Sequence, residues 1–297
     1  MTGGALLGSG LISRKAEAKA AGYGPKLSVE GYIWIQRFDA QKKTIAEGVE
    51  EALATFHRAG YRRVELSSDF FKGDVRAKTL ELLSKYHLRP ETTYAGSTMH
   101  EPQAAHASVA EILELAKALK PAGGRWIVTN PMPKPNHGRK SDQELTIQAE
   151  YVNQLGRELR QLGFGLMIHH HTPELVDNAR EWRHLLQNTD PRVVSCCVDV
   201  DWAVRGGQDP IAFLREVGTR LESLHLRNDQ QGVWMEEFGP GDIDYQKVSD
   251  YLHKIKFSGY LVVELAYEKN TRISRPLEED LRRSRFYAEK VFGLSPA

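Results

Sequence analysis

Histidines and acidic residues follow several short apolar runs of the chain. The run FGLMI, residues 164–168, leads directly into His169, His170 and His171. Neighbouring side chains of an extended chain point to opposite sides, so His169 and His171 should share one side, with His170 on the other. Imidazole nitrogens bind divalent metals and exchange protons near neutral pH. The triplet therefore predicts either a metal site or a hydrogen-bonded cluster at the end of a buried strand.

Later apolar runs end in a similar way. Asp199 and Asp201 follow VVSCCV, His225 and Arg227 close LESLHLR, and Glu264 ends VVE. The spacing of two within each pair places both side chains of the pair on one side of an extended strand. Nitrogen and carboxylate ligands together suit a divalent Mn, Co, Zn, Fe or Ni ion. The predicted metal ligands are His169, Asp199, His225 and Glu264.

Extended apolar runs alternate with amphipathic helical patterns from residue 25 to residue 297, in eight strand–helix units. The first strand is expected over residues 26–35, which would place Tyr32 and Trp34 near its end, and Glu65 follows in the second strand. Such alternation predicts a parallel sheet, and eight units favour one closed (β/α)8 TIM barrel. Active sites of these barrels lie at the carboxyl ends of the strands, where the histidines and acids gather.

Composition excludes several partners. The chain has 40 basic and 39 acidic residues and a net charge of +1, which argues against nucleic acid or a membrane surface. Cys196 and Cys197 are adjacent and are not expected to form a disulfide. Residues 1–24 are predicted to be a tail, either a frayed end or the remnant of an export signal with small residues before a cleavage site. The first option implies the cytoplasm and the second the periplasm.

Four motifs carry a family resemblance: CVDVDWAVRGGQDP, LHLRND, FGPGDIDY and GYLVVELAYE. They resemble signatures of the xylose isomerase-like TIM-barrel superfamily, in particular its sugar phosphate isomerase/epimerase group and the related inosose dehydratases. The resemblance covers most of residues 27–293. It implies a divalent metal held by Asp199, His225, Glu264 and a residue that ends the fifth strand. There His169 stands in place of the usual glutamate, and the triple histidine matches an inosose dehydratase pattern.

The resemblance also implies roles for individual side chains. Glu264 and His171 are the expected proton carriers. Trp202 stands where many members have a substrate-binding histidine, while Arg227 and Asn228 replace the usual lysine and aspartate. A long loop after the seventh strand carries Trp234 and Glu237 and could reach over the pocket. The predicted substrate-binding residues are Tyr32, Trp34, Glu65, Trp202, Arg227, Asn228 and Glu237.

These observations predict a metal-dependent sugar isomerase/epimerase that abstracts a proton next to a carbonyl. One alternative is a lyase that dehydrates a keto-sugar or inosose, and another is a sugar-binding barrel without turnover. An endonuclease IV-like nuclease is disfavoured by the neutral charge and the small ligand set. The expected partner is a small sugar or cyclic polyol, and the resemblance leaves a homo-oligomer open.

Overall fold

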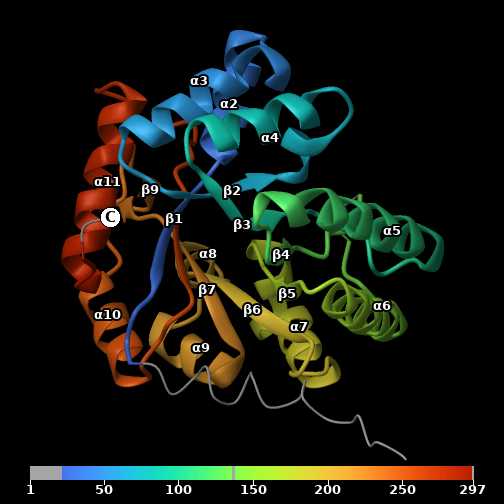
Figure 1. Cartoon of the computed structure of the whole chain (residues 1–297). Coiled ribbons are helices and arrows are strands. Elements are labelled where there is room, and N and C mark those ends of the chain that lie inside the picture. The colour runs from blue at the N-terminus through green and yellow to red at the C-terminus, as the bar shows by residue number, and fades with distance from the viewer. Residues whose placement is uncertain (1–21, 136–137, 296–297) are drawn as a thin grey trace, which may run out of the picture.

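The computed structural model describes residues 22–135 and 138–295 of the chain, which form one barrel of parallel strands (Figure 1). Strand order around the closed barrel is β1-β10-β7-β6-β5-β4-β3-β2. This confirms the predicted (β/α)8 TIM barrel. The eight strands are β1 (Lys26–Glu30), β2 (Arg63–Ser67), β3 (Arg89–Tyr94), β4 (Trp126–Thr129), β5 (Gly165–Ile168), β6 (Val194–Asp199), β7 (Leu221–Leu226) and β10 (Tyr260–Val263).

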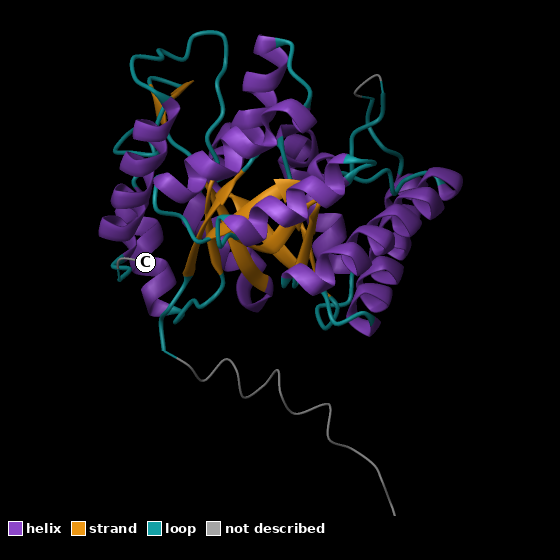
Figure 2. Ribbon diagram, turned by 45° about the horizontal axis from the view of Figure 1, so that its top comes forward, coloured by secondary structure: helices purple, strands orange, loops and turns teal. Residues whose placement is uncertain are grey.

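Helices surround the strands, as Figure 2 shows. Two long helices begin with capping boxes, in which Thr44 and Ser141 exchange hydrogen bonds with the glutamate three residues later. Their apolar faces pack on the barrel and bury the main core. The helices are α2 (Tyr32–Gln41), α3 (Ile45–Arg58), α4 (Val75–Lys85), α5 (Pro102–Leu119), α6 (Asp142–Gln161), α7 (Thr172–Asn188), α8 (Val200–Arg205), α9 (Pro210–Val217), α10 (Tyr245–Lys254) and α11 (Leu277–Phe292).

The barrel closes where its first and last strands meet. Lys26 pairs with Tyr260 and Val29 with Val263, so β1 and β10 run side by side. On the other side of β1, Glu30 pairs with Glu65 of β2. Side chains at the carboxyl ends of β1, β2 and β10 therefore converge although they are distant in sequence.

The predicted first strand is too long. The strand ends at Glu30, and α2 begins at Tyr32 after Gly31 adopts a helical backbone conformation. A Cβ atom at Gly31 would lie 2.9 Å from Leu66 Cδ2, so this tight turn suits a glycine. Trp34 is buried on α2 with Phe38, because the apolar residues after the turn form the inner face of a helix rather than alternate along a strand.

The predicted placement of Asp201 on the sixth strand is also wrong, although both Asp199 and Asp201 approach Arg227. Asp199 ends β6 and caps α8, and Asp201 lies in the first turn of that helix. The aspartate oxygen accepts the backbone N–H of Trp202, which favours a helix start over a longer strand. A short antiparallel pair, β8 (Asp229–Gln230) with β9 (Val233–Trp234), was not predicted.

The predicted tail, residues 1–24, lies outside the described residues except for its last three. Within the described part of the chain, no helix is long and apolar enough to cross a membrane. Cys196 and Cys197 are both buried and free, in agreement with the expectation that they form no disulfide.

Candidate active site

A cavity of about 310 Å³ opens at the carboxyl ends of the strands. We call it the carboxyl-end cavity. It combines acids, histidines and one arginine with aromatic side chains, a lining that suits a small polar ligand with an apolar face. Its lining residues are Glu30, Tyr32, Ile35, Ser67, Asp69, Tyr94, His169, His171, Trp202, His225, Arg227, Trp234 and Glu264.

His225 lies between two carboxylates. Its Nε2 atom is 2.8 Å from Glu65 Oε1, and its Nδ1 atom is 2.7 Å from Glu264 Oε2. Glu65 is fully buried and is not among the residues that line the carboxyl-end cavity. A carboxylate on one imidazole nitrogen fixes the ring and its tautomer, and the other nitrogen of His225 faces Glu264 on the side of the cavity. The position of Glu65 therefore suits orientation of His225 rather than the predicted substrate contact.

Arg227 places a buried guanidinium among three carboxylates. It donates through Nη2 to Asp199 Oδ2 at 2.8 Å and also to Glu264 Oε1, and its Nε lies 3.8 Å from Asp201 Oδ2. The rings of Trp202 and Trp234 lie 5.4 and 4.6 Å from the guanidinium carbon. The arginine thus links the ends of β6, β7 and β10. Without it, Asp199 and Glu264 would be buried without a countercharge.

The histidine triplet divides as alternation predicts. His169 and His171 line the carboxyl-end cavity, whereas His170 packs against Trp182 and Phe213 outside the barrel. The ring centroids of His169 and His225 are 4.6 Å apart. His171 lies edge-on to the ring of Trp202 at 5.6 Å. Two histidines of the triplet therefore face the site, and the third belongs to the core.

Burial and charge set the protonation of the site. Burial lowers the pKa of His171 to about 4 and that of His169 well below its usual value, which favours neutral imidazoles. Burial alone would raise the pKa of Glu264, but Arg227 and His225 reverse this and keep it below its usual range. Glu264 is therefore a carboxylate and His171 a free base at neutral pH.

Three predicted substrate contacts lie elsewhere. Trp34 belongs to the core beneath α2, with its ring 5.7 Å from that of Phe38. Asn228 donates to the carbonyls of Gly239 and Ile243, at 2.8 and 3.1 Å, and so shapes the loop after β7. Glu237 pairs with Arg275 at 3.0 Å. These side chains do not line the carboxyl-end cavity, whereas the predicted Tyr32, Trp202 and Arg227 do.

Other residues of the site were missed from the sequence. Glu30 and Tyr94 line the carboxyl-end cavity, and Cys197 lies close to His169 and His225. The strand expected over residues 26–35 places Glu30 in its middle, so the sequence pattern does not mark Glu30 as the end of a strand. The register of β1 with β2 would have revealed it, because it pairs Glu30 with Glu65.

The donor groups fit a divalent cation. Ligand atoms of Glu30, His225 and Glu264 lie within 4.8 Å of one another, as do those of His169, Cys197 and His225. Two buried atoms of these groups, Glu30 Oε2 and His169 Nδ1, have no hydrogen-bond partner among the described residues. His225 Nδ1 and Glu264 Oε2 contact each other at 2.7 Å. Buried polar atoms are normally satisfied, so a cluster of unsatisfied donors and acceptors indicates a missing ligand or ion.

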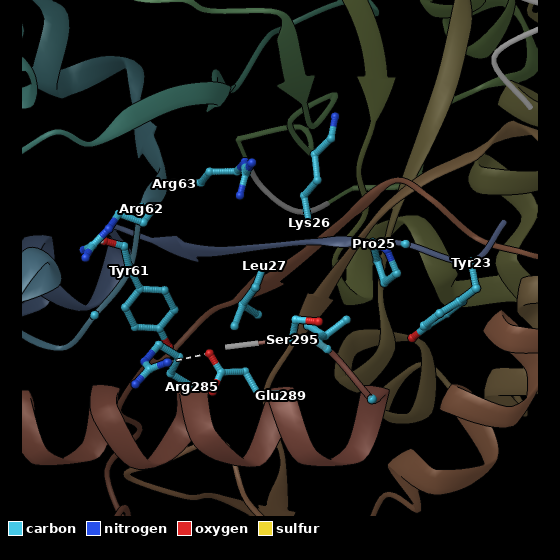
Figure 3. Close-up of a pocket in the computed structure, with 14 residues that line it drawn as sticks. Tyr23, Pro25, Lys26, Leu27, Tyr61, Arg62, Arg63, Arg285, Glu289 and Ser295 are labelled. Carbon is cyan, nitrogen blue, oxygen red and sulfur yellow. Dashed lines mark hydrogen bonds and ion pairs between the residues drawn. The ribbon is translucent and has the colours of Figure 1, made fainter. Parts of the chain in front are cut away.

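A second cavity, of about 360 Å³, lies at the opposite end of the barrel, where β1 and β2 begin (Figure 3). We call it the amino-end cavity. Two of its arginines form ion pairs: Arg285 with Glu289, and Arg63 with Glu91 at 3.1 Å. The hydroxyl of Tyr61 donates to the Leu281 carbonyl. No predicted site residue lines this cavity.

Comparison with known proteins agrees with this fold. The family model "Xylose isomerase-like TIM barrel" matches residues 53–287. An inosose dehydratase of Clostridium perfringens is 28% identical over 169 residues, which are 51% of this chain and 56% of that protein, so the chain spans little more than half of that relative. One of Mesomycoplasma hyopneumoniae is 24% identical, with 77% and 84% of the two chains covered.

Solved structures share the fold at low identity. A sugar phosphate isomerase/epimerase from Parabacteroides distasonis superposes with a TM-score of 0.71 at 19% identity, and covers 91% of this chain and 97% of its own. An L-ribulose 3-epimerase gives 0.70 at 12% identity, with 91% and 95% covered. The family match extends over most of the barrel and includes the strand ends that carry His169, Asp199, His225 and Glu264. The chain therefore belongs to the xylose isomerase-like TIM-barrel family, as its sequence motifs predicted.

Proposed function

We propose that the protein is a divalent-metal-dependent sugar isomerase/epimerase that abstracts a proton next to the carbonyl of its substrate. The observation that carries this proposal is the meeting of Glu264 and His171 in one cavity beside unsatisfied ligand atoms. Both groups are in their basic forms at neutral pH. Either group can remove the proton, and the conjugate acid that forms can return it to the neighbouring carbon, as isomerisation requires. Epimerisation requires that the second group deliver a proton that it has first taken from water.

A bound divalent ion would polarise the substrate carbonyl as a Lewis acid. Of the predicted ligands, His169, His225 and Glu264 line the carboxyl-end cavity. His169 Nδ1 has no hydrogen-bond partner among the described residues, and His225 Nδ1 lies 2.7 Å from Glu264 Oε2. Glu65 holds the His225 ring from the far side. Trp202 and Trp234 stand at 5.4 Å, edge to face, and offer an apolar wall for a sugar ring.

The proposed substrate is an unphosphorylated sugar or cyclic polyol. Arg227 is the arginine that lines the carboxyl-end cavity, and it is already paired with Asp199 and Glu264. Phosphate recognition normally uses a guanidinium or backbone cradle that is free to bind oxygens. The carboxylates of Asp69 and Glu264 would also repel a phosphate. A neutral polyol instead suits carboxylates, which accept its hydroxyl hydrogens.

A dehydratase is the second candidate, and the curated relatives favour it because they are named inosose dehydratases. Elimination of water needs one proton abstraction and one protonated leaving group. A glutamate and a histidine in one cavity supply both functions when one of them carries a proton. The same residues therefore support either outcome, and the product distinguishes them.

The test is incubation of the purified protein and Mn²⁺ with a panel of keto-sugars and inososes in D₂O. Deuterium next to the carbonyl without loss of water supports the isomerase/epimerase, and loss of water supports the dehydratase. The Glu264→Gln variant is the control for enzyme-dependent exchange. Binding of a sugar without exchange or elimination would contradict both, and would support a non-catalytic sugar-binding barrel.

A further inference from the structure

The ring of Trp234 is held in the wall of the carboxyl-end cavity by residues from other loops. Trp234 ends β9, in the short antiparallel pair that follows β7. Its indole Nε1 donates to Asp201 Oδ2 at 2.8 Å, and its backbone N–H donates to Glu268 Oε1 at 2.7 Å. Asp201 lies in the first turn of α8, and Glu268 lies in the segment after β10. The loops after β6 and β10 therefore determine where this ring stands.

Arg205, the last residue of α8, contacts both of these partners of Trp234. Its Nε donates to Asp201 Oδ1 at 3.3 Å, and its Nη2 donates to Glu268 Oε1 at 3.1 Å. Nη2 also donates to Asp229 Oδ2 at 3.1 Å and to the carbonyl of Gly232 at 3.3 Å, both in the β8–β9 pair. One guanidinium thus ties α8 to the β8–β9 pair and to the segment after β10. The fixed fork of an arginine suits several such bonds at once, and a lysine ammonium does not reproduce it.

The guanidinium of Arg205 also lies over the ring that it positions. Its Cζ is 4.8 Å from the ring centroid of Trp234, and the Cζ of Arg227 is 4.6 Å from the same centroid. A cation at this distance from an indole face is attracted to the ring. Arg227 lines the carboxyl-end cavity, whereas Arg205 does not. Any effect of Arg205 on an uncharged ligand in the cavity therefore passes through the residues that it holds.

Trp234 and Trp202 form a corner of the cavity wall. Their ring centroids are 5.4 Å apart with the ring planes at 81°, and both residues line the carboxyl-end cavity. Asp201 already accepts the indole N–H of Trp234, so this ring faces a ligand without a free polar atom. A sugar that packs its apolar face on the corner needs the Trp234 ring to stay in place.

We infer that Arg205 is a positioning residue that fixes Trp234 against the carboxyl-end cavity, and that the fixed ring determines how tightly the site holds a sugar. This inference rests on the sugar substrate in the proposed function. A ring already held in place spares the ligand the cost of ordering it. The proposed proton carriers, Glu264 and His171, are not among the partners of Arg205 in the described part of the chain. Loss of Arg205 should therefore weaken binding more than it slows the chemical step.

Near-ultraviolet circular dichroism of the full-length protein without substrate tests the position of the ring, because only fixed aromatic side chains give strong signals there. The difference between wild type and Trp234→Phe gives the contribution of Trp234. Arg205→Gln should lose at least about half of that contribution, and Arg205→Lys should lose less, since it keeps the charge. Arg183→Gln is the control, because the Arg183 side chain is 28% exposed, against 24% for Arg205, and pairs with Glu216 of α9.

Kinetics with the substrate found in the sugar panel test the consequence. Arg205→Gln should raise KM by about tenfold and change kcat by less than about threefold. In Arg205→Gln/Trp234→Phe, KM should stay near that of Trp234→Phe alone, because the arginine acts through the ring.

Urea unfolding shows which variants fold, and Arg205→Lys replaces Arg205→Gln in both measurements if the latter does not. A folded Arg205 variant with the wild-type near-ultraviolet spectrum overturns the inference, and so do additive effects on KM or a loss confined to kcat. If the wild type turns over no sugar, the proposed function fails by itself, and the spectra still decide whether Arg205 fixes Trp234.

Discussion

Charged side chains are buried at both ends of the barrel, but the two ends differ in whether the buried polar atoms have hydrogen-bond partners. At the amino end, Glu91 accepts from Arg63 at 3.1 Å and from Tyr260 at 2.9 Å. Arg285 pairs with Glu289 there, as Figure 3 shows. None of the residues around the amino-end cavity has a buried side-chain atom without a hydrogen-bond partner in the described part of the chain. The carboxyl end instead retains such atoms on Glu30 and His169.

The difference separates groups that stabilise the fold from groups that serve a site. An unsatisfied buried polar atom costs about 1–3 kcal/mol, so several in one cavity reduce the stability of the folded state. The amino end avoids this cost by pairing its charges. At the carboxyl end the folded state keeps this cost in stability, as expected where a ligand supplies the missing hydrogen-bond partners.

The largest expected effect is on catalysis at the carboxyl end. Glu264→Gln should lower the deuterium exchange rate by about 10²–10⁴-fold, because an amide cannot accept the substrate proton as a carboxylate does. Isotope exchange in D₂O measures this rate. Glu91→Gln, at the amino end, should leave exchange near the wild-type rate. Equal losses in the two variants would contradict a site confined to the carboxyl end.

The next effect is on stability. Arg227→Met should lower the free energy of unfolding by about 3–5 kcal/mol, because Asp199 and Glu264 lose their buried countercharge. Urea unfolding measures the change. Combining Arg227→Met with Asp199→Asn should recover part of it. A loss below about 1 kcal/mol would mean that the acids find other partners.

A pH effect should arise beside the histidine triplet. Burial and Glu181 raise the pKa of Glu174 to about 7, above its unfolded value. Its contribution to stability is therefore complete below the unfolded pKa and is lost as the pH rises toward 7. Between pH 5 and pH 8, Glu174 should lower the free energy of unfolding of the wild type by up to about 3 kcal/mol. The Glu174→Gln variant should not show this loss. Urea unfolding at both pH values checks this, and parallel profiles for the two proteins would refute it.

A smaller effect concerns the orientation of His225, a proposed metal ligand. Glu65→Ala should weaken Mn²⁺ binding by about 10–100-fold, because His225 loses the carboxylate that fixes its ring. Glu65→Gln keeps an oxygen for the imidazole and should recover part of the affinity. Calorimetric titration of both variants measures this. Equal affinities for the two variants would show that Glu65 acts by charge alone.

The smallest effect is expected at the amino end. Arg285→Ala removes the ion pair with Glu289 and a 2.9 Å hydrogen bond to the Ala59 carbonyl. Both interactions are part-buried, so the free energy of unfolding should fall by about 1 kcal/mol. Thermal unfolding measures this change, and exchange activity should stay at the wild-type level. A loss of activity in the folded variant would show that the two ends are coupled.

The sequence predicts the barrel because its strand–helix repeats follow local periodicity and need no tertiary information. It also predicts that His169 and His171 face the cavity, since alternation along a strand is local. Glu30 and the partners of Asp199 were not predictable in this way. The end of β1 depends on a turn at Gly31 packed against Leu66, and the partners of Asp199 depend on how Arg227 reaches across three strands.

Closure of the barrel between β1 and β10 has a consequence for how the protein is made. Glu30 belongs to an early part of the nascent chain, and Glu264 to a late part. Chains emerge from the ribosome with the amino-terminal part first, so β1 must wait for its last neighbour until β10 has been synthesised. A ribosome-bound or prematurely terminated chain therefore lacks the carboxylates of both strands in one place. A ligand that needs both carboxylates can then bind only to chains in which β10 has been made.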